Sequence, residues 1–275
     1  MIIKKRKDKS DFNKKGQVTI FVIIAVLVVV AGVLVYLFLP EFSISQKDDL
    51  ENPQDYIKNC ISDKTKEVIN KVSLQGGSLN PEAYYLHGGS EVEYLCYSNE
   101  YYDLCSVQRP FLEEHIEEEI KSGISQKTES CFSSLKQEYQ NKGYNAEIVS
   151  GEINADVLPE RVFIDLNRTI YINKEGNSET HKNFEINLGS KLKKMIGVAQ
   201  NIIEWESSVG TAEPSFYMNQ HHDLIVNKKP QGDETIIYII EDNAEENKFK
   251  FASRSLAFPP GYGVPPSNVM PEQNE

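Results

Sequence analysis

The sequence predicts an α+β protein: an N-terminal transmembrane helix, then an extracytoplasmic head with a helical layer and a mostly antiparallel sheet. Three observations support this prediction. Residues 18–39 carry no charge, apolar residues then recur at helical spacing up to Gly143, and from Tyr144 the apolar period changes to two. Helices that precede strands, instead of alternating with them, favour the α+β class over a parallel α/β sheet.

The uncharged stretch is long enough to cross a bilayer, because its 22 residues would span about 33 Å as a helix. Pro40 ends this helix. Seven basic and two acidic residues precede it, and such a positive flank stays in the cytoplasm. We therefore expect a basic cytoplasmic leader at 1–16, a transmembrane helix at 17–40 in the lipid bilayer and a linker at 41–51. The C-terminal head should lie outside the cytoplasm.

The head is strongly acidic. The chain holds 29 Lys or Arg and 41 Asp or Glu; without the seven and two of the leader, 22 and 39 remain, a net charge of −17. Nucleic-acid binding needs a cationic surface that displaces counterions from phosphates, so we expect no nucleic-acid partner. An acidic exterior is typical of a soluble surface.

All four cysteines lie in the head, at positions 60, 96, 105 and 131. An even number in an exported compartment indicates two disulfides. Zinc is the alternative, but there is no C-x-x-C pair and no histidine at ligand spacing from a cysteine. Of the three pairings that four cysteines allow, the most economical is Cys96–Cys105 with Cys60–Cys131, because the last two lie on predicted helices.

Two helices are predicted in residues 52–143, the disulfide-stapled first part of the head. Asn52 followed by proline is typical of a helix start, and Gly76 with a second glycine is typical of a helix end. The second helix should run from Pro110 to residue 143. Gly123 lies inside it and indicates a kink or a break.

Between these helices, residues 78–108 show no period, which predicts a long ordered loop with one short strand at 92–97. Six of the chain's 14 tyrosines fall in this loop: Tyr84, Tyr85, Tyr94, Tyr97, Tyr101 and Tyr102. Tyrosine offers a large, rigid contact area at low entropic cost, as binding loops exploit. The rings could instead pack the loop against the helices. If they are exposed, we expect a protein or glycan partner here.

Residues 144–258 should form the α+β part of the head. Its sequon at Asn167 falls in a predicted strand and is a candidate glycosylation site. After Phe258 the tail, residues 259–275, contains five prolines and is expected to be disordered. The expected elements are strands at 146–151, 162–166 and 169–172, a turn at 174–177, a returning strand at 184–188, a helix at 190–208, and two late strands at 236–240 and 249–253.

No motif assigns a catalytic, cofactor-binding or metal site. The sequence lacks a G-x-S-x-G elbow, a phosphate-binding G-x-x-x-x-G-K-[ST] and a G-x-G-x-x-G. Adjacent histidines at His221 and His222 are followed by Asp223, but neighbouring side chains rarely chelate one ion without a third ligand. Acidic residues are numerous enough to supply carboxylate pairs, which only geometry can select.

The junction before the apolar stretch carries one family resemblance. Lys14-Lys15-Gly16, followed by Gln17-Val18-Thr19-Ile20-Phe21, resembles archaeal class III signal peptides, the leaders of type IV pilin-like proteins. The resemblance is limited to this leader and the apolar helix, about 25 of 275 residues. It implies that a prepilin-type peptidase cuts between Gly16 and Gln17, with Lys15 in the recognised basic stretch. Phe21 stands where many bacterial pilins carry glutamate, and Pro40 interrupts a helix that pilins usually continue.

These observations predict a single-pass membrane protein at the cell surface, whose acidic head acts as a structural or adhesive binding module without a cofactor. Two alternatives remain from the sequence. One is an anchored extracytoplasmic hydrolase that uses carboxylates. The other is a minor subunit of a type IV pilus-like machine.

Overall fold

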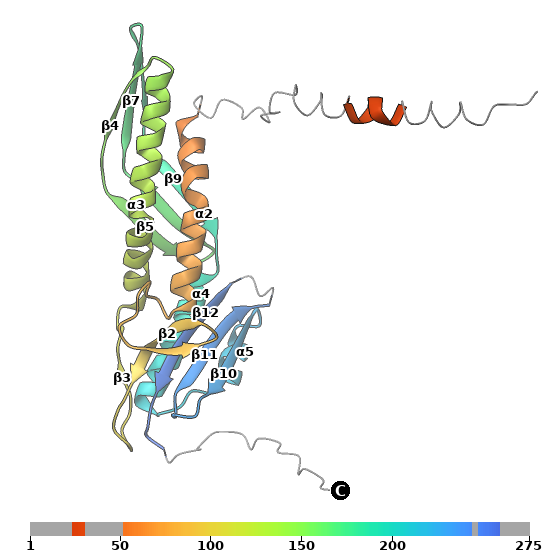
Figure 1. Cartoon of the computed structure of the whole chain (residues 1–275). Coiled ribbons are helices and arrows are strands. Elements are labelled where there is room, and N and C mark those ends of the chain that lie inside the picture. The colour runs from red at the N-terminus through yellow and green to blue at the C-terminus, as the bar shows by residue number, and fades with distance from the viewer. Residues whose placement is uncertain (1–23, 31–51, 244–246, 259–275) are drawn as a thin grey trace, which may run out of the picture. The chain divides into compact units, whose positions relative to one another are not determined.

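The structure is a computed structural model that describes residues 24–30, 52–243 and 247–258 (Figure 1). The chain divides into two units, residues 1–48 and 49–275. In the first, residues 24–30 are helical. No helix among the described residues is both long enough and apolar enough to cross a membrane. Apart from 24–30, the expected leader, transmembrane helix and linker lie outside these residues, as does the proline-rich tail.

The head is α+β, with mostly antiparallel sheets, as the sequence predicts. Its helical layer consists of α2 (Pro53–Leu74) and α3 (Leu112–Asn141). The Asn52 side chain accepts a hydrogen bond from the Gln54 amide at 3.2 Å, so the predicted cap forms. Gly76 then adopts a φ of 82°, which stops α2 where the sequence indicates.

The two long helices lie side by side and are joined by the Cys60–Cys131 disulfide, with 6.0 Å between Cα atoms. Gly123 does not break α3, which is one helix over its whole length. A Cβ at Gly123 would lie 2.8 Å from Cγ1 of Val68 on α2 and 2.9 Å from Cδ1 of Leu79. The predicted break is therefore absent, and the glycine permits close approach of the helices.

A six-stranded sheet forms beyond the C-terminal end of α2. Its order is β1-β2-β12-β11-β10, with β3 on β2, and only the β2–β12 pair is parallel. The strands are β1 (Tyr84–His87), β2 (Ser90–Tyr97), β3 (Ser106–Val107), β10 (Leu224–Pro230), β11 (Ile236–Asp242) and β12 (Lys248–Arg254). The expected loop at 78–108 thus contains three strands instead of one, because β2 is recruited by a partner strand from the far end of the chain.

Two three-stranded sheets cover the rest of the helical layer. One has the order β4-β7-β8 and the other β5-β6-β9. The strands are β4 (Asn145–Val149), β5 (Ile153–Leu158), β6 (Arg161–Leu166), β7 (Thr169–Lys174), β8 (Asn177–His181) and β9 (Phe184–Gly189). The predicted turn forms with Gly176 at a φ of 87°, but it leads into β8. The expected returning strand at 184–188 is β9, and it pairs with β6.

Helices α4 (Leu192–Ser208) and α5 (Pro214–Gln220) pack on one face of the six-stranded sheet. One main core joins α2, α3, α4 and the inner faces of the three sheets, from Ile57 to Phe251. A separate small cluster occupies the opposite face of the six-stranded sheet, around Val92 and Ile237. None of the described helices contributes to that second cluster.

Gly123 offers a test of the helix packing. We expect Gly123→Ala to be less stable than a Gly197→Ala variant by about 1–3 kcal/mol in the free energy of unfolding. Both changes gain helix propensity, but a Cβ at Gly197 meets nothing within 4 Å, whereas one at Gly123 clashes with Val68. Urea unfolding followed by circular dichroism measures the difference. Equal stability of the two variants would contradict the close-approach argument.

Candidate functional site

The Cys96–Cys105 disulfide closes a short loop, residues 98–105, which we call the stapled loop. The two Cα atoms lie 5.3 Å apart and both cysteines are buried. The backbone of the loop is also hydrogen-bonded to the last residue of β12 and to the segment that follows it. The Ser98 amide donates to the Arg254 carbonyl at 2.8 Å, and the Tyr102 amide donates to the Leu256 carbonyl at 2.7 Å. The loop is therefore held at both ends and in its middle.

Large apolar side chains project from this rigid loop. Tyr101 is 62% exposed and Tyr102 75% exposed. Leu104 of the same loop lies next to Gly210, just after α4. Val209, which precedes Gly210 in the chain, is also exposed. We call Tyr101, Tyr102, Leu104 and Val209 the tip patch. Tyr102 has a φ of 63°, a conformation that a bulky side chain adopts at a cost and that often marks functional positions.

The six tyrosines of the sequence cluster do not share one surface. Tyr84 is exposed on β1, and Tyr101 and Tyr102 belong to the tip patch. The other three, Tyr85, Tyr94 and Tyr97, lie on the outer face of the six-stranded sheet. Tyr94 and Tyr97 meet edge to face at 4.9 Å, and the Tyr94 hydroxyl bonds with Thr235 Oγ1 at 2.9 Å. Three of the six rings therefore pack, but on the sheet face turned away from the helices and not against the helices as the sequence alternative had it; the other three are exposed.

A serine, a histidine and an acid meet near the end of α2, but not as a catalytic triad. Ser78 Oγ lies 2.8 Å from His115 Nε2 and donates to Glu93 Oε2 at 2.5 Å. Arg109 Nε donates to the other Glu93 oxygen at 2.9 Å. In a triad the acid orients the histidine, whereas here it binds the serine and the arginine. Ser78 and Glu93 are buried, so the cluster ties the chain after α2 to β2 and α3.

Glu206 is a fully buried carboxylate that the sequence analysis missed. It accepts hydrogen bonds from the Tyr238 hydroxyl, from Ser253 Oγ at 3.1 Å and from the Ala212 amide at 3.0 Å. Burial raises the pKa of Glu206 and lowers the pKa of nearby Lys228. This network attaches the end of α4 to β11 and β12. The sequence does contain an indication of this buried residue: Glu206 lies on the apolar stripe of the predicted helix, three residues after Ile203.

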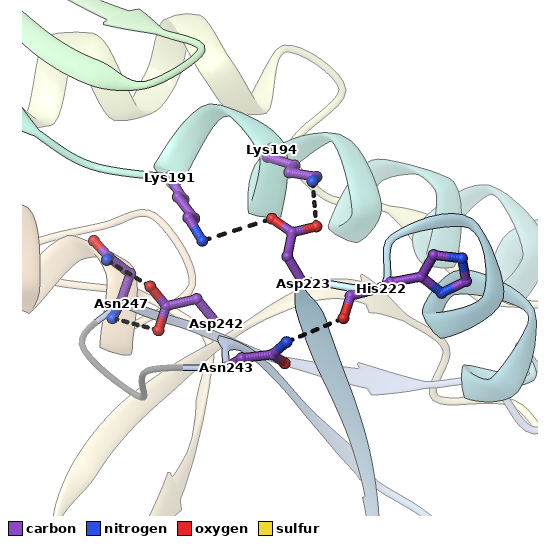
Figure 2. Close-up of polar contacts among 7 residues, drawn as sticks. All are labelled: Lys191, Lys194, His222, Asp223, Asp242, Asn243 and Asn247. Carbon is purple, nitrogen blue, oxygen red and sulfur yellow. Dashed lines mark hydrogen bonds and ion pairs between the residues drawn. The ribbon is translucent and has the colours of Figure 1, made fainter.

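The His221-His222-Asp223 run forms a structural junction (Figure 2). Lys194 donates a hydrogen bond to Asp223, and Lys191 Nζ lies 3.6 Å from it. The hydrogen bond from Lys194 lowers the pKa of Asp223. The His222 ring points away from these groups, while its carbonyl accepts from Asn243 at 3.1 Å. Throughout the described part of the chain, no group of three or more potential ligands could hold a metal ion.

Carboxylates gather in an open groove between α3 and the β5–β6 pair. The acids that line it are Glu114, Glu117, Glu118, Asp156 and Asp165. Burial raises the pKa of Glu117, and the carboxylates of Glu113 and Asp156 act in the same direction. One Glu117 oxygen accepts from the Val157 amide at 2.8 Å. The hydrolase alternative would find its acids here, but no histidine or cysteine is among the described residues of the groove.

A pocket of about 300 Å³ lies between α2, the end of β9 and the start of α4. Its described walls include Lys66, Asn70, Ser73, Met195 and Lys248. They contain no carboxylate, histidine or cysteine, so they lack the acid–base pair that hydrolysis requires.

Two further sites were predicted from the sequence: the leader cleavage point and the glycosylation sequon. Lys15, Gly16 and Gln17, at the expected leader cleavage point, lie outside the described residues. Asn167 is exposed in the two-residue connection between β6 and β7. Its expected position inside a strand is wrong, because β6 ends at Leu166 and β7 begins at Thr169. The connection leaves the Asn167 side chain accessible.

Glu206 gives the head a predictable pH dependence. A folded pKa above the unfolded value means that the folded state binds more protons, so this contribution to stability is present at low pH. It should be lost as the pH rises above the unfolded value of about 4.3. Relative to Glu206→Gln, which does not titrate, the wild-type protein should therefore lose stability with rising pH. Urea unfolding between about pH 4 and 8 measures this; a constant difference would contradict it.

Comparison with known proteins identifies no relative that could suggest a function. No family model matches the chain, and no curated protein and no solved structure is similar to it. The function therefore has to be argued from the geometry of the described head and from the N-terminal sequence.

Proposed function

We propose that the chain is a membrane-anchored surface protein whose disulfide-stapled head works by binding a protein or glycan partner through the tip patch. The observation that supports this most directly is the exposure of the Tyr101 and Tyr102 side chains on a constrained loop. They are the most exposed tyrosines of the sequence cluster, and they stand on a loop that a disulfide and backbone hydrogen bonds hold rigid. Pre-ordered aromatic side chains lose little entropy on binding.

The position of the loop in the head supports the same proposal. The chain enters the described head at the start of α2, and the Gln75 carbonyl at the other end of that helix accepts from Glu93 of β2. The stapled loop follows β2 (Figure 1). About 33 Å of helix thus separates the chain entry from the sheet that carries the loop. If the head is tethered at Pro53, the tip patch lies at the end of the head that is remote from the tether.

The two disulfides are consistent with an oxidising, extracellular environment. In that compartment, exposed Asn167 is open to glycosylation. The proposal places residues 17–40 in the bilayer and the leader 1–16 in the cytoplasm, with removal of the leader by a prepilin-type peptidase. It rests for this on the Lys-Lys-Gly-Gln junction and the uncharged stretch that follows it.

Loss of the tip tyrosines should weaken partner binding without loss of fold. We expect a Tyr101→Ala/Tyr102→Ala variant of the full chain to lose at least about tenfold in affinity, since aromatic anchors dominate binding energy. Glycan microarrays and adhesion to intact source cells provide the measurement. The matched control is Tyr84→Ala/Tyr171→Ala, which removes two tyrosines of 45% and 42% exposure elsewhere on the head. Equal loss in both variants would contradict a role for the tip patch.

The anchor can be tested separately. N-terminal sequencing of the protein from its native membrane should find Gln17 as the first residue, because the family resemblance implies cleavage after Gly16. A Gly16→Leu variant should retain the leader and migrate as a longer chain. An intact leader on the native protein would contradict processing by a prepilin-type peptidase.

A further inference from the structure

The outer face of the six-stranded sheet, which we call the open face, differs from the rest of the head. Its centre is the small cluster of Val92, Tyr94, Ile237 and Ala252, with Tyr85, Tyr97 and Ile239 at its edge. The described helices α2, α4 and α5 pack on the opposite face, against the main core. The open face shares no residue with the tip patch, so it is a second surface.

Strand register brings positive charge to this face. On β12, Lys250 and Arg254 alternate with buried Ala252, so the three point to the same side. Lys229 of β10 lies opposite Ile237 of the small cluster, and Lys250 lies opposite Ile239. Lys250 and Arg254 are thus about 13 Å apart along β12, and β10 lies about 10 Å to the side.

These cations are not neutralised within the described head. Lys229 and Lys250 form no ion pair with a described carboxylate, and Arg254 donates to the backbone carbonyls of Asp233 and Ser98. Burial lowers the pKa of His87, and the charges of Lys250 and Lys229 lower it further. Two acids lie at this face: Glu241 pairs with Lys248 at 2.9 Å, and Asp233, in the β10–β11 turn near Tyr94, accepts hydrogen bonds from Thr235. The open face is therefore positive in a head with a net charge of −17.

The remaining apolar surface is too small for a stable protein partner. Val92, Ile237 and Ala252 are already fully buried, so little apolar area could be gained by docking. Five strands of up to eight residues make a face of about 500 Å², below the roughly 800 Å² that each partner buries in a standard interface. A narrow linear ligand needs only a strip of that area.

We propose that the open face binds a linear, carboxylate-bearing polysaccharide. Lys229, Lys250 and Arg254 pair with its carboxylates, and the rings of Tyr85 and Tyr97 provide apolar contact for sugar units. The Arg254 guanidinium already lies 5.8 Å from the Tyr97 ring centre, so charge and ring are presented together. Nucleic acid is disfavoured because its phosphate backbone is more densely charged than a chain with one carboxylate per sugar unit, so the acidic remainder of the head repels it more strongly.

The test uses the full chain in detergent micelles and immobilised polygalacturonate, with neutral dextran, single-stranded DNA and poly-glutamate as comparison probes. At about 50 mM NaCl we expect binding to polygalacturonate that weakens steeply as salt is added. A Lys229→Glu/Lys250→Glu variant should lose at least about tenfold in affinity. The milder Lys229→Gln/Lys250→Gln variant should lose less, in the same direction. Unfolding curves identify any variant that fails to fold.

Two controls separate this surface from other effects. Lys127→Glu/Lys136→Glu on α3 makes the same change in net charge away from the open face and should leave binding unchanged. The tip variant Tyr101→Ala/Tyr102→Ala should bind polygalacturonate as the wild type does. The result at the open face can therefore be told apart from a result that contradicts the proposed function of the tip patch. The proposal is overturned if polygalacturonate does not bind, if the open-face variants bind it normally, or if DNA or poly-glutamate binds equally well.

Discussion

The head depends on the parallel pairing of β2 with β12. This contact joins Tyr94 with Ala252 and Cys96 with Ser253, residues from opposite ends of the head's sequence, and it includes a register shift between them. Without it, β1, β2 and β3 would have no sheet to join. The stapled loop would also lose its hydrogen bonds to Arg254 and Leu256, because these residues directly follow β12 or end it. Long-range strand pairing of this kind is costly in chain entropy and must be secured by packing.

Packing secures the β2–β12 pairing because the two faces of β12 have different surroundings. Phe249, Phe251 and Ser253 point to the main core, where Ser253 donates to buried Glu206. Lys250 and Arg254 point to the open face. A slip of one residue would place charges in the core and rings in solvent, so the register is strongly specified. The Glu206 network adds to this, since its donors come from β11, β12 and the chain after α4.

Each proposed surface thus sits on a rigid support. The tip patch relies on the Cys96–Cys105 disulfide and on the backbone of the β12 end, and the open face relies on the sheet itself. Their chemistry differs: one is aromatic and apolar, the other cationic. The Cys60–Cys131 disulfide contributes elsewhere, by joining the two long helices about 12 Å along their axes from the Gly123–Val68 contact. Removing a disulfide of this kind typically costs 2–5 kcal/mol.

Local chemistry was sufficient to predict part of this structure. The Asn52 cap, the Gly76 stop, the long helices, α4 and the two late strands follow from short-range patterns, because caps, glycines and apolar periods act within a few residues. The disulfide pairing could be inferred because it depends on helix faces and short spacing. The tertiary structure alone decided the rest. It made Gly123 a helix–helix contact instead of a break, and it formed β1, β2 and β3 in a segment where one strand was expected. It also distributed six neighbouring tyrosines over the open face, the tip patch and the exposed side of β1, because burial depends on strands that are distant in the sequence.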